Sequence, residues 1–243
     1  MIRDLDSSFK IVSYFQITYM KPICTLIICF FLLQNSFSQT VVKDTVKTTV
    51  TDSIQKIARD SIVKAKEDSV KWAKMEAKLI YPLLKAGTWS GVLPVPDADE
   101  IPDPSISYKL LFELVLPTKA KESKDINHGL TEICRLLNLH VASGIAVKKI
   151  TPVIVVHGSA LFAFYNNEFY QKKFKTDNPN IAVIEELIKK TGARFIACGQ
   201  AMQFLEIQHS ELIPQMKVSV TAQTVLSHYQ LKGYKLYEIA EDK

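Results

Sequence analysis

The stretch PVIVVHGSA, residues 152–160, decides the fold. Its first five residues, Pro152 to Val156, are apolar without a break and mostly β-branched. Such a run is typical of a strand buried on both faces of a sheet. His157 and Gly158 then end the run, as expected where a strand reaches the edge of its sheet. Because strands covered on both faces occur mainly in parallel sheets flanked by helices, the stretch predicts an α/β fold.

Strand and helix patterns alternate on both sides of this stretch. Short β-branched or apolar runs predict strands, and apolar residues at helical spacing predict helices. The alternation predicts an α/β three-layer sandwich with a mostly parallel sheet of about five strands, which is a flavodoxin-like architecture. We expect this domain to span residues 107–243. The predicted strands are 108–116, 152–156, 194–197, 217–220 and 234–239, and the predicted helices are 126–140, 161–173, 181–190, 200–206 and 221–231.

Residues 40–84 form a separate region with an internal repeat. An Asp-Thr-Val or Asp-Ser-Ile/Val unit recurs every eight residues, beginning at Asp44, Asp52, Asp60 and Asp68. On an α-helix that spacing advances the apolar side chains by about 80° per unit, so they cannot form a heptad seam. The pattern predicts a charged, partly helical spacer, and an interaction helix is the alternative.

Residues 85–106 are rich in proline and glycine and predict a linker. Trp89 and the apolar segment 92–95 indicate that part of this linker docks on the domain as a short hairpin.

The N-terminus has the order of a secretory signal. Lys21 precedes an apolar run, residues 23–33, and Ser36 and Ser38 supply small side chains before a cleavage site at Gln39. We therefore expect residues 1–39 to be a signal-peptide region, with translation starting at Met20 and the signal at about 20–38. The mature protein would be periplasmic or secreted, with membrane contact only through the export signal. An uncleaved N-terminal anchor is the alternative.

The charge and motif content exclude several functions. The formal net charge is +5, and the sequence lacks the dense basic stripe that a nucleic-acid footprint needs. There is no glycine-rich dinucleotide or phosphate loop and no recurring metal-ligand spacing. We expect no cofactor, no metal and no nucleic-acid partner.

Polar residues follow several of the predicted strands. In parallel α/β sheets the chemistry lies outside the carboxyl ends of the strands. That rule gathers the candidate binding residues Asn127, His128, Gly158, Ser159, Gly199, Gln200 and Thr221, together with the candidate catalytic residues His157 and Cys198.

Cys198 is the residue on which we base the catalytic hypothesis. It ends a predicted strand, and a short helix follows it. A thiol at a helix N-terminus meets free N–H groups that favour the nucleophilic thiolate, and a nearby His157 would add to this effect. The alternative is a buried cysteine that only fills space. Cys134, on the apolar face of its predicted helix, is expected to be a packing residue.

Several motifs together resemble the DsrE/DsrF-like sulfur-relay family. They are VVHGSAL at 155–161, NPN at 178–180, FIACGQ at 195–200, VSVTAQT at 218–224 and NHGL at 127–130. The chain is similar to an exported, Bacteroidetes-type member. The resemblance implies a parallel α/β sandwich that forms a homo-oligomer. It also implies that Cys198 matches the cysteine that carries a persulfide and passes sulfur to a partner protein.

Two functional hypotheses follow. The first is a DsrE-like envelope protein that handles sulfur or redox equivalents through Cys198, with a sulfur-acceptor or envelope protein as partner. The second is a non-catalytic module of the cell envelope that binds a small ligand or assembles as an oligomer.

Overall fold

The computed structural model describes residues 43–240, with side chains from Gln55 onward. The predicted signal region 1–39 and its start at Met20 lie outside the described residues. The described residues fall into two units, with the division between Glu67 and Asp68.

Helix α2, Lys43–Glu76, carries the eight-residue repeat, so this part of the region is helical as expected, while its role as a spacer stays a prediction. All of its side chains from Gln55 to Lys74 are exposed. This exposure agrees with an apolar pattern that winds around the helix instead of forming one face. Among residues 43–240 no helix combines the length and the apolar character needed to cross a bilayer.

The second unit contains a five-stranded sheet in the order β4-β3-β2-β1-β5, with every neighbouring pair parallel. This sheet confirms the predicted α/β class and strand number. Strand β2 pairs with β1 from Ile150 to Val156, so the apolar run that indicates the fold lies inside the sheet. The strands are β1 Tyr108–Leu114, β2 Ile150–Val156, β3 Arg194–Cys198, β4 Met216–Ser219 and β5 Lys235–Ile239.

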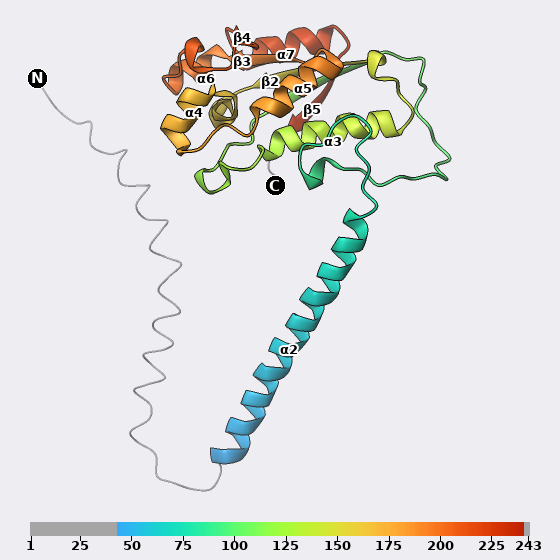
Figure 1. Cartoon of the computed structure of the whole chain (residues 1–243), viewed down its shortest axis with the longest axis vertical. Coiled ribbons are helices and arrows are strands. Elements are labelled where there is room, and N and C mark those ends of the chain that lie inside the picture. Colours follow the sequence, from blue (N-terminus) through green and yellow to red (C-terminus); the bar gives the residue numbers. More distant parts are fainter. Residues whose placement is uncertain (1–42, 241–243) are drawn as a thin grey trace, which may run out of the picture. The chain divides into compact units, whose positions relative to one another are not determined.

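Helices cover both faces of the sheet, which gives the three predicted layers (Figure 1). The larger face packs against α3, α4, α5 and α6 through side chains such as Leu130, Tyr170 and Ile184. The other face packs against α7 through Ala222, Leu226 and Tyr229. The helices are α3 His128–Ala142, α4 Asn167–Phe174, α5 Ile181–Thr191, α6 Gly199–Phe204 and α7 Ala222–Leu231.

The predicted helix 161–173 is wrong at its first half. The chain instead forms a 3-10 helix, η5 Gly158–Phe164, and then starts α4 after Asn166. The Asn166 side chain accepts a hydrogen bond from the Phe169 N–H at 3.1 Å, and the Asn166 backbone N–H donates to Glu211 O at 2.8 Å. Asparagine is among the best N-cap residues, so a new helix begins there and the earlier turn stays separate.

The segment between α2 and β1 is fixed to the domain by Asn138 of α3. Asn138 is fully buried, and its Oδ1 accepts the N–H groups of Leu83 and Leu84 at 2.8 and 3.2 Å. Its Nδ2 donates to Leu84 O and Ser90 O at 2.9 and 2.8 Å. An antiparallel bridge joins Ile80 to Val92. Part of the proline- and glycine-rich region therefore docks as predicted, around the short 3-10 helix η2 Thr88–Ser90.

Candidate functional site

The sheet brings the predicted catalytic residues Cys198 and His157 to the carboxyl ends of adjacent strands. Cys198 is the last residue of β3, and His157 follows β2 directly. The pairing of β2 with β3 ends at Val156 and Ala197, so the next position in each strand is His157 and Cys198. Both residues face the α7 side of the sheet, because side chains alternate along a strand and Val155 and Ile196 lie on that side.

The Cys198 thiol is almost enclosed, with 4% of the residue exposed. Its Sγ accepts the N–H of Ala222 at 3.2 Å and lies 4.0 Å from Oγ1 of Thr221. Ala222 is the first residue of α7, whose leading N–H groups have no partner within the helix. The sulfur thus lies at the positive end of a helix, a position that attracts negative charge.

His157 is paired with Glu113, a residue that the sequence analysis missed. His157 Nε2 lies 2.8 Å from Glu113 Oε1, and both side chains are about a quarter exposed, at 24% and 21%. Glu113 is the one acidic residue in the otherwise apolar end of β1, LLFEL. A carboxylate inside a buried strand was the signal that could have identified it, since ionised side chains in such positions are usually partnered.

These side chains form a row across four adjacent strands. Glu113 of β1 is in register with Glu238 of β5, while His157 and Cys198 follow on β2 and β3. The row places a thiol, an imidazole and a carboxylate in sequence, the set of groups that activates nucleophiles in many enzymes. Among the hydrogen bonds of the described residues, none joins the imidazole of His157 to the thiol of Cys198.

The backbone geometry at this edge requires glycine at two positions. A side chain at Gly199 would place its Cβ 2.5 Å from Ser219 O, so only glycine allows β3 and β4 to pair this closely. The Gln200 N–H donates to Val220 O at 3.1 Å, and its side chain is exposed. Gly158 has a φ of 61°, which lets the chain turn out of β2 toward the half-buried Ser159.

Asn127 and His128 are placed at the start of α3. Asn127 is buried and caps α3, because its Oδ1 accepts the N–H of Gly129 at 2.9 Å. The Asn127 backbone N–H donates to Oδ1 of the buried Asn180 at 2.7 Å. Through these bonds Asn127 fixes the loop that precedes α3. The His128 side chain is 64% exposed, and the Glu122 carboxylate lies 3.9 Å from it.

Cys134 provides a contrast with Cys198. It is fully buried in α3, and that burial, together with the charge of Glu186, raises the pKa of the Cys134 thiol to about 12. A thiol that stays protonated is inert as a nucleophile. Within residues 55–240, no group of three or more His, Cys, Asp or Glu side chains is arranged to hold a metal ion.

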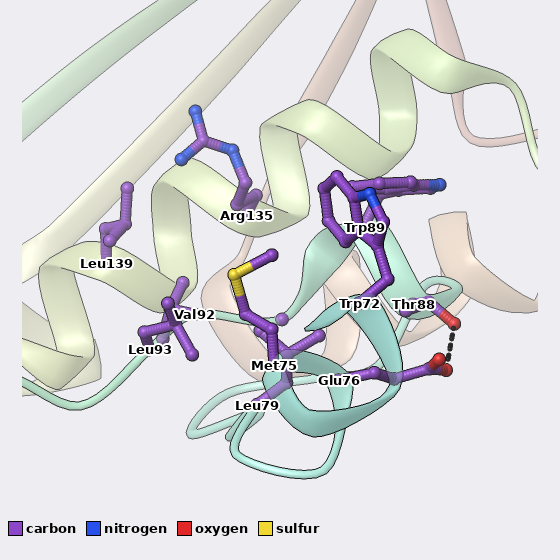
Figure 2. Close-up of a pocket in the computed structure, with 11 residues that line it drawn as sticks. Trp72, Met75, Glu76, Leu79, Thr88, Trp89, Val92, Leu93, Arg135 and Leu139 are labelled. Atoms are coloured by element: carbon purple, nitrogen blue, oxygen red, sulfur yellow. Dashed lines mark hydrogen bonds between the residues drawn. The ribbon is translucent and has the colours of Figure 1, made fainter. Parts of the chain in front are cut away.

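A second concave site is built by other elements. The last turns of α2, the segment 79–93 and α3 enclose a pocket of about 850 Å³ (Figure 2). Trp72 and Trp89 meet there edge to face with their ring centroids 5.1 Å apart. Met75, Leu79, Val92, Leu93 and Leu139 add apolar surface, and Glu76, Thr88 and Arg135 are the polar side chains of the lining.

The fold and the strand-end thiol together define a parallel α/β domain of the kind that carries its chemistry at the carboxyl edge. The sequence model of the DsrE/DsrF-like family matches residues 109–237. The chain therefore belongs to the DsrE/DsrF-like family, which confirms the family resemblance; the exported, Bacteroidetes-type character stays a prediction. No curated protein matches the chain.

One solved structure similar to this chain is a protein of unknown function from Methanobacterium thermoautotrophicum. It is 14% identical in sequence, with a TM-score of 0.40, and the match covers 54% of this chain and 98% of that protein.

Proposed function

We propose that this protein is a thiol-based sulfur-handling protein in which Cys198 is the sulfur-bearing residue. The observation that carries the proposal is the hydrogen bond from the Ala222 N–H at the start of α7 to Cys198 Sγ, 3.2 Å long. The position beside His157 and its partner Glu113 gives further support. Family membership supports the same chemistry.

The proposed step is attack by the Cys198 thiolate on a sulfane sulfur of a polysulfide. The new S–S bond forms at Cys198, the donor's S–S bond breaks, and the shortened polysulfide leaves with the electron pair. The thiol proton passes to solvent or to His157. The product is a cysteine persulfide, ready to be passed to an acceptor thiol on a partner protein.

The test is intact-protein mass spectrometry after incubation with sodium polysulfide. We expect the chain from Gln39 onward, which lacks Cys24 and Cys29, to gain the mass of one sulfur atom, mapped to Cys198, and its Cys198→Ala variant to gain none. Cys134→Ala is the matched control, and it should load like the wild type because Cys134 is inert. Loading that persists in Cys198→Ala, or a wild type that takes up no sulfur, would contradict the proposal.

The near-complete burial of Cys198 favours a second candidate, a non-catalytic envelope module in which the thiol only lines the sheet edge. Complementation distinguishes the two. A Cys198→Ser strain that keeps the full wild-type phenotype would support the module and remove the sulfur chemistry.

We further propose that the mature protein works in the periplasm or outside the cell as a homo-oligomer. The order of basic, apolar and small residues over positions 20–38 supports export. N-terminal sequencing of the cellular protein should begin at Gln39. A chain that retains residues 20–38 would indicate the membrane-anchored alternative. Light scattering of the purified protein should give a mass above that of one chain, and a monomer would contradict the oligomer.

A further inference from the structure

The pocket between α2 and α3 lies outside the part of the chain that the family explains. Most of its lining comes from residues 72–93, whereas the family match begins at residue 109. Only Arg135 and Leu139 belong to the matched region. The pocket is therefore an addition to the family domain, and its use is independent of Cys198.

The lining is unusually aromatic for an exposed surface. The chain contains two tryptophans, Trp72 and Trp89, and both line this pocket. They are 50% and 60% exposed, and the neighbouring Leu93 is 43% exposed. Figure 2 shows Met75 beside the tryptophans and Leu79 below it, and both line the same pocket. Large apolar side chains that gather in a solvent-accessible hollow usually mark a binding site.

The lining of the pocket is mostly apolar. Arg135 is neutralised by a two-point pair with Glu132, at 2.6 and 2.7 Å. Glu76 accepts a hydrogen bond from Thr88 Oγ1 at 3.2 Å, which Figure 2 shows as a dashed line, and keeps its charge at an exposed position. The other lining side chains are tryptophan, methionine, leucine and valine. Burying an ion against such side chains is costly, so the lining favours an uncharged occupant.

The walls are held in place before any ligand arrives. Asn138 fixes residues 83–90 with four hydrogen bonds, and the Ile80–Val92 bridge closes the segment. The volume of about 850 Å³ is within the range of roughly 300–1,000 Å³ that is typical of small-molecule sites. A preformed hollow of this size suits a compact molecule.

We propose that this pocket binds an uncharged, apolar, ring-containing small molecule that stacks on Trp72 and Trp89. The flat faces of the indoles provide the contact area, and Thr88 and Glu76 supply a polar edge for a hydroxyl group of the ligand. This site goes beyond the proposed thiol chemistry and does not depend on it.

The probe for the test is N-phenyl-1-naphthylamine, an uncharged aromatic dye that accepts energy from excited tryptophan. Since both tryptophans line the pocket, energy transfer in the full-length protein reports on dye bound there. We expect saturable transfer in the wild type and in Cys198→Ser. Saturable transfer in the wild type with none in Cys198→Ser would contradict the independence of the two sites.

The decisive variant is Met75→Lys, which keeps both tryptophans and places an ammonium group in the apolar wall. We expect its affinity for the dye to fall by about tenfold or more, since the charge must be desolvated or must exclude the ligand. Leu231→Lys, at a 90% exposed position of α7, adds the same charge elsewhere and should bind the dye like the wild type. If Met75→Lys unfolds, Leu93→Lys at the exposed rim replaces it.

Two outcomes would overturn the proposal. The first is equal affinity for the dye in the wild type and in the folded Lys variants. The second is that the dye binds only when the protein is diluted, and that Met75→Lys has a lower molecular mass than the wild type in light scattering. That result would show that a second copy of the chain occupies the pocket.

Discussion

The thiol edge and the tryptophan pocket arise in different ways. Cys198 and His157 are brought together by sheet topology, and both lie in the region that the DsrE/DsrF-like family model matches. The pocket is formed where a segment preceding that region folds onto α3. The common fold and the added segment therefore each provide a site. We expect mutations to disable one of the two sites and leave the other intact.

The largest expected effect comes from removing the side chain that anchors the added segment. Asn138→Leu keeps the side-chain size but leaves the N–H groups of Leu83 and Leu84 and the carbonyls of Leu84 and Ser90 without their partner. We expect a loss of about 3 kcal/mol of stability in urea denaturation. Hydrogen exchange should rise over residues 79–93 and stay low in the sheet. The exposed Gln203→Leu should change the stability by less than about 0.5 kcal/mol. Uniform loss of protection across the domain would break the distinction between the two regions.

A smaller effect is expected at the thiol edge from Gly199→Ala. Its new Cβ would meet Ser219 O at 2.5 Å, and a backbone atom cannot move aside without disturbing the β3–β4 pairing. We expect a loss of about 2 kcal/mol, with sulfur loading impaired and dye binding retained. Gly144→Ala is the control, because its φ of 87° strains the backbone while the Cβ meets no atom within 4 Å. It should cost about 1 kcal/mol and leave both sites intact. Equal costs for the two variants would show that close packing at Gly199 is unimportant.

A still smaller effect is expected from changing Glu113, the residue that orients His157. Glu113→Gln keeps the shape of the side chain and removes its charge, so the imidazole loses its carboxylate partner at 2.8 Å. Both groups are partly exposed, and stability should change by less than about 1 kcal/mol. The rate of sulfur loading at Cys198 should fall by about tenfold if His157 takes part in proton transfer. Glu238→Gln, one strand further from the thiol, is the matched control. A similar decrease in both variants would indicate a general charge effect on this face.

The smallest effect is expected at Cys134. Its pKa is raised from an ordinary value of 9.0 to about 12, so the folded protein holds this proton more tightly than the unfolded chain. The stability due to this difference is complete below pH 9 and is lost as the pH rises from 9 toward 12. Iodoacetamide at pH 8 should leave Cys134 unmodified in the folded protein and modify it in urea, as read by peptide mass spectrometry. Modification of Cys134 in the folded state would contradict this burial.

The sequence was sufficient for the sheet because each strand has a local pattern. The apolar run at residues 152–156 records a strand buried on both faces, and the apolar spacing at 181–190 records a helix buried on one face. The helix predicted at 161–173 failed because apolar periodicity continues across Asn166, while the cap and the Tyr165–Leu212 bridge stop the helix there. Periodicity cannot report a competing long-range contact.

The sites were less predictable, since they depend on pairs that are distant in the chain. Cys198 and His157 could be placed at one edge from topology alone. The partner of His157, Glu113, lies 44 residues earlier, and the bonds of Asn138 reach back 54 and 55 residues. Asn127, predicted to bind a ligand, has a structural contact that its position in the sequence did not indicate, because its side chain caps α3.

The anchoring of Leu83 and Leu84 also has a mechanical meaning. A pull on the chain from its N-terminal side first reaches the Ile80–Val92 bridge and then the bonds of Leu83 to Asn138 and to the Lys190 ammonium, the latter 2.9 Å long. The bonds to Asn138 and Lys190 transmit the force to α3 and α5, and the force does not pass through a strand of the sheet first. Traction on the spacer would therefore strip the tryptophan-bearing segment from its helix before it strained the sulfur-bearing edge.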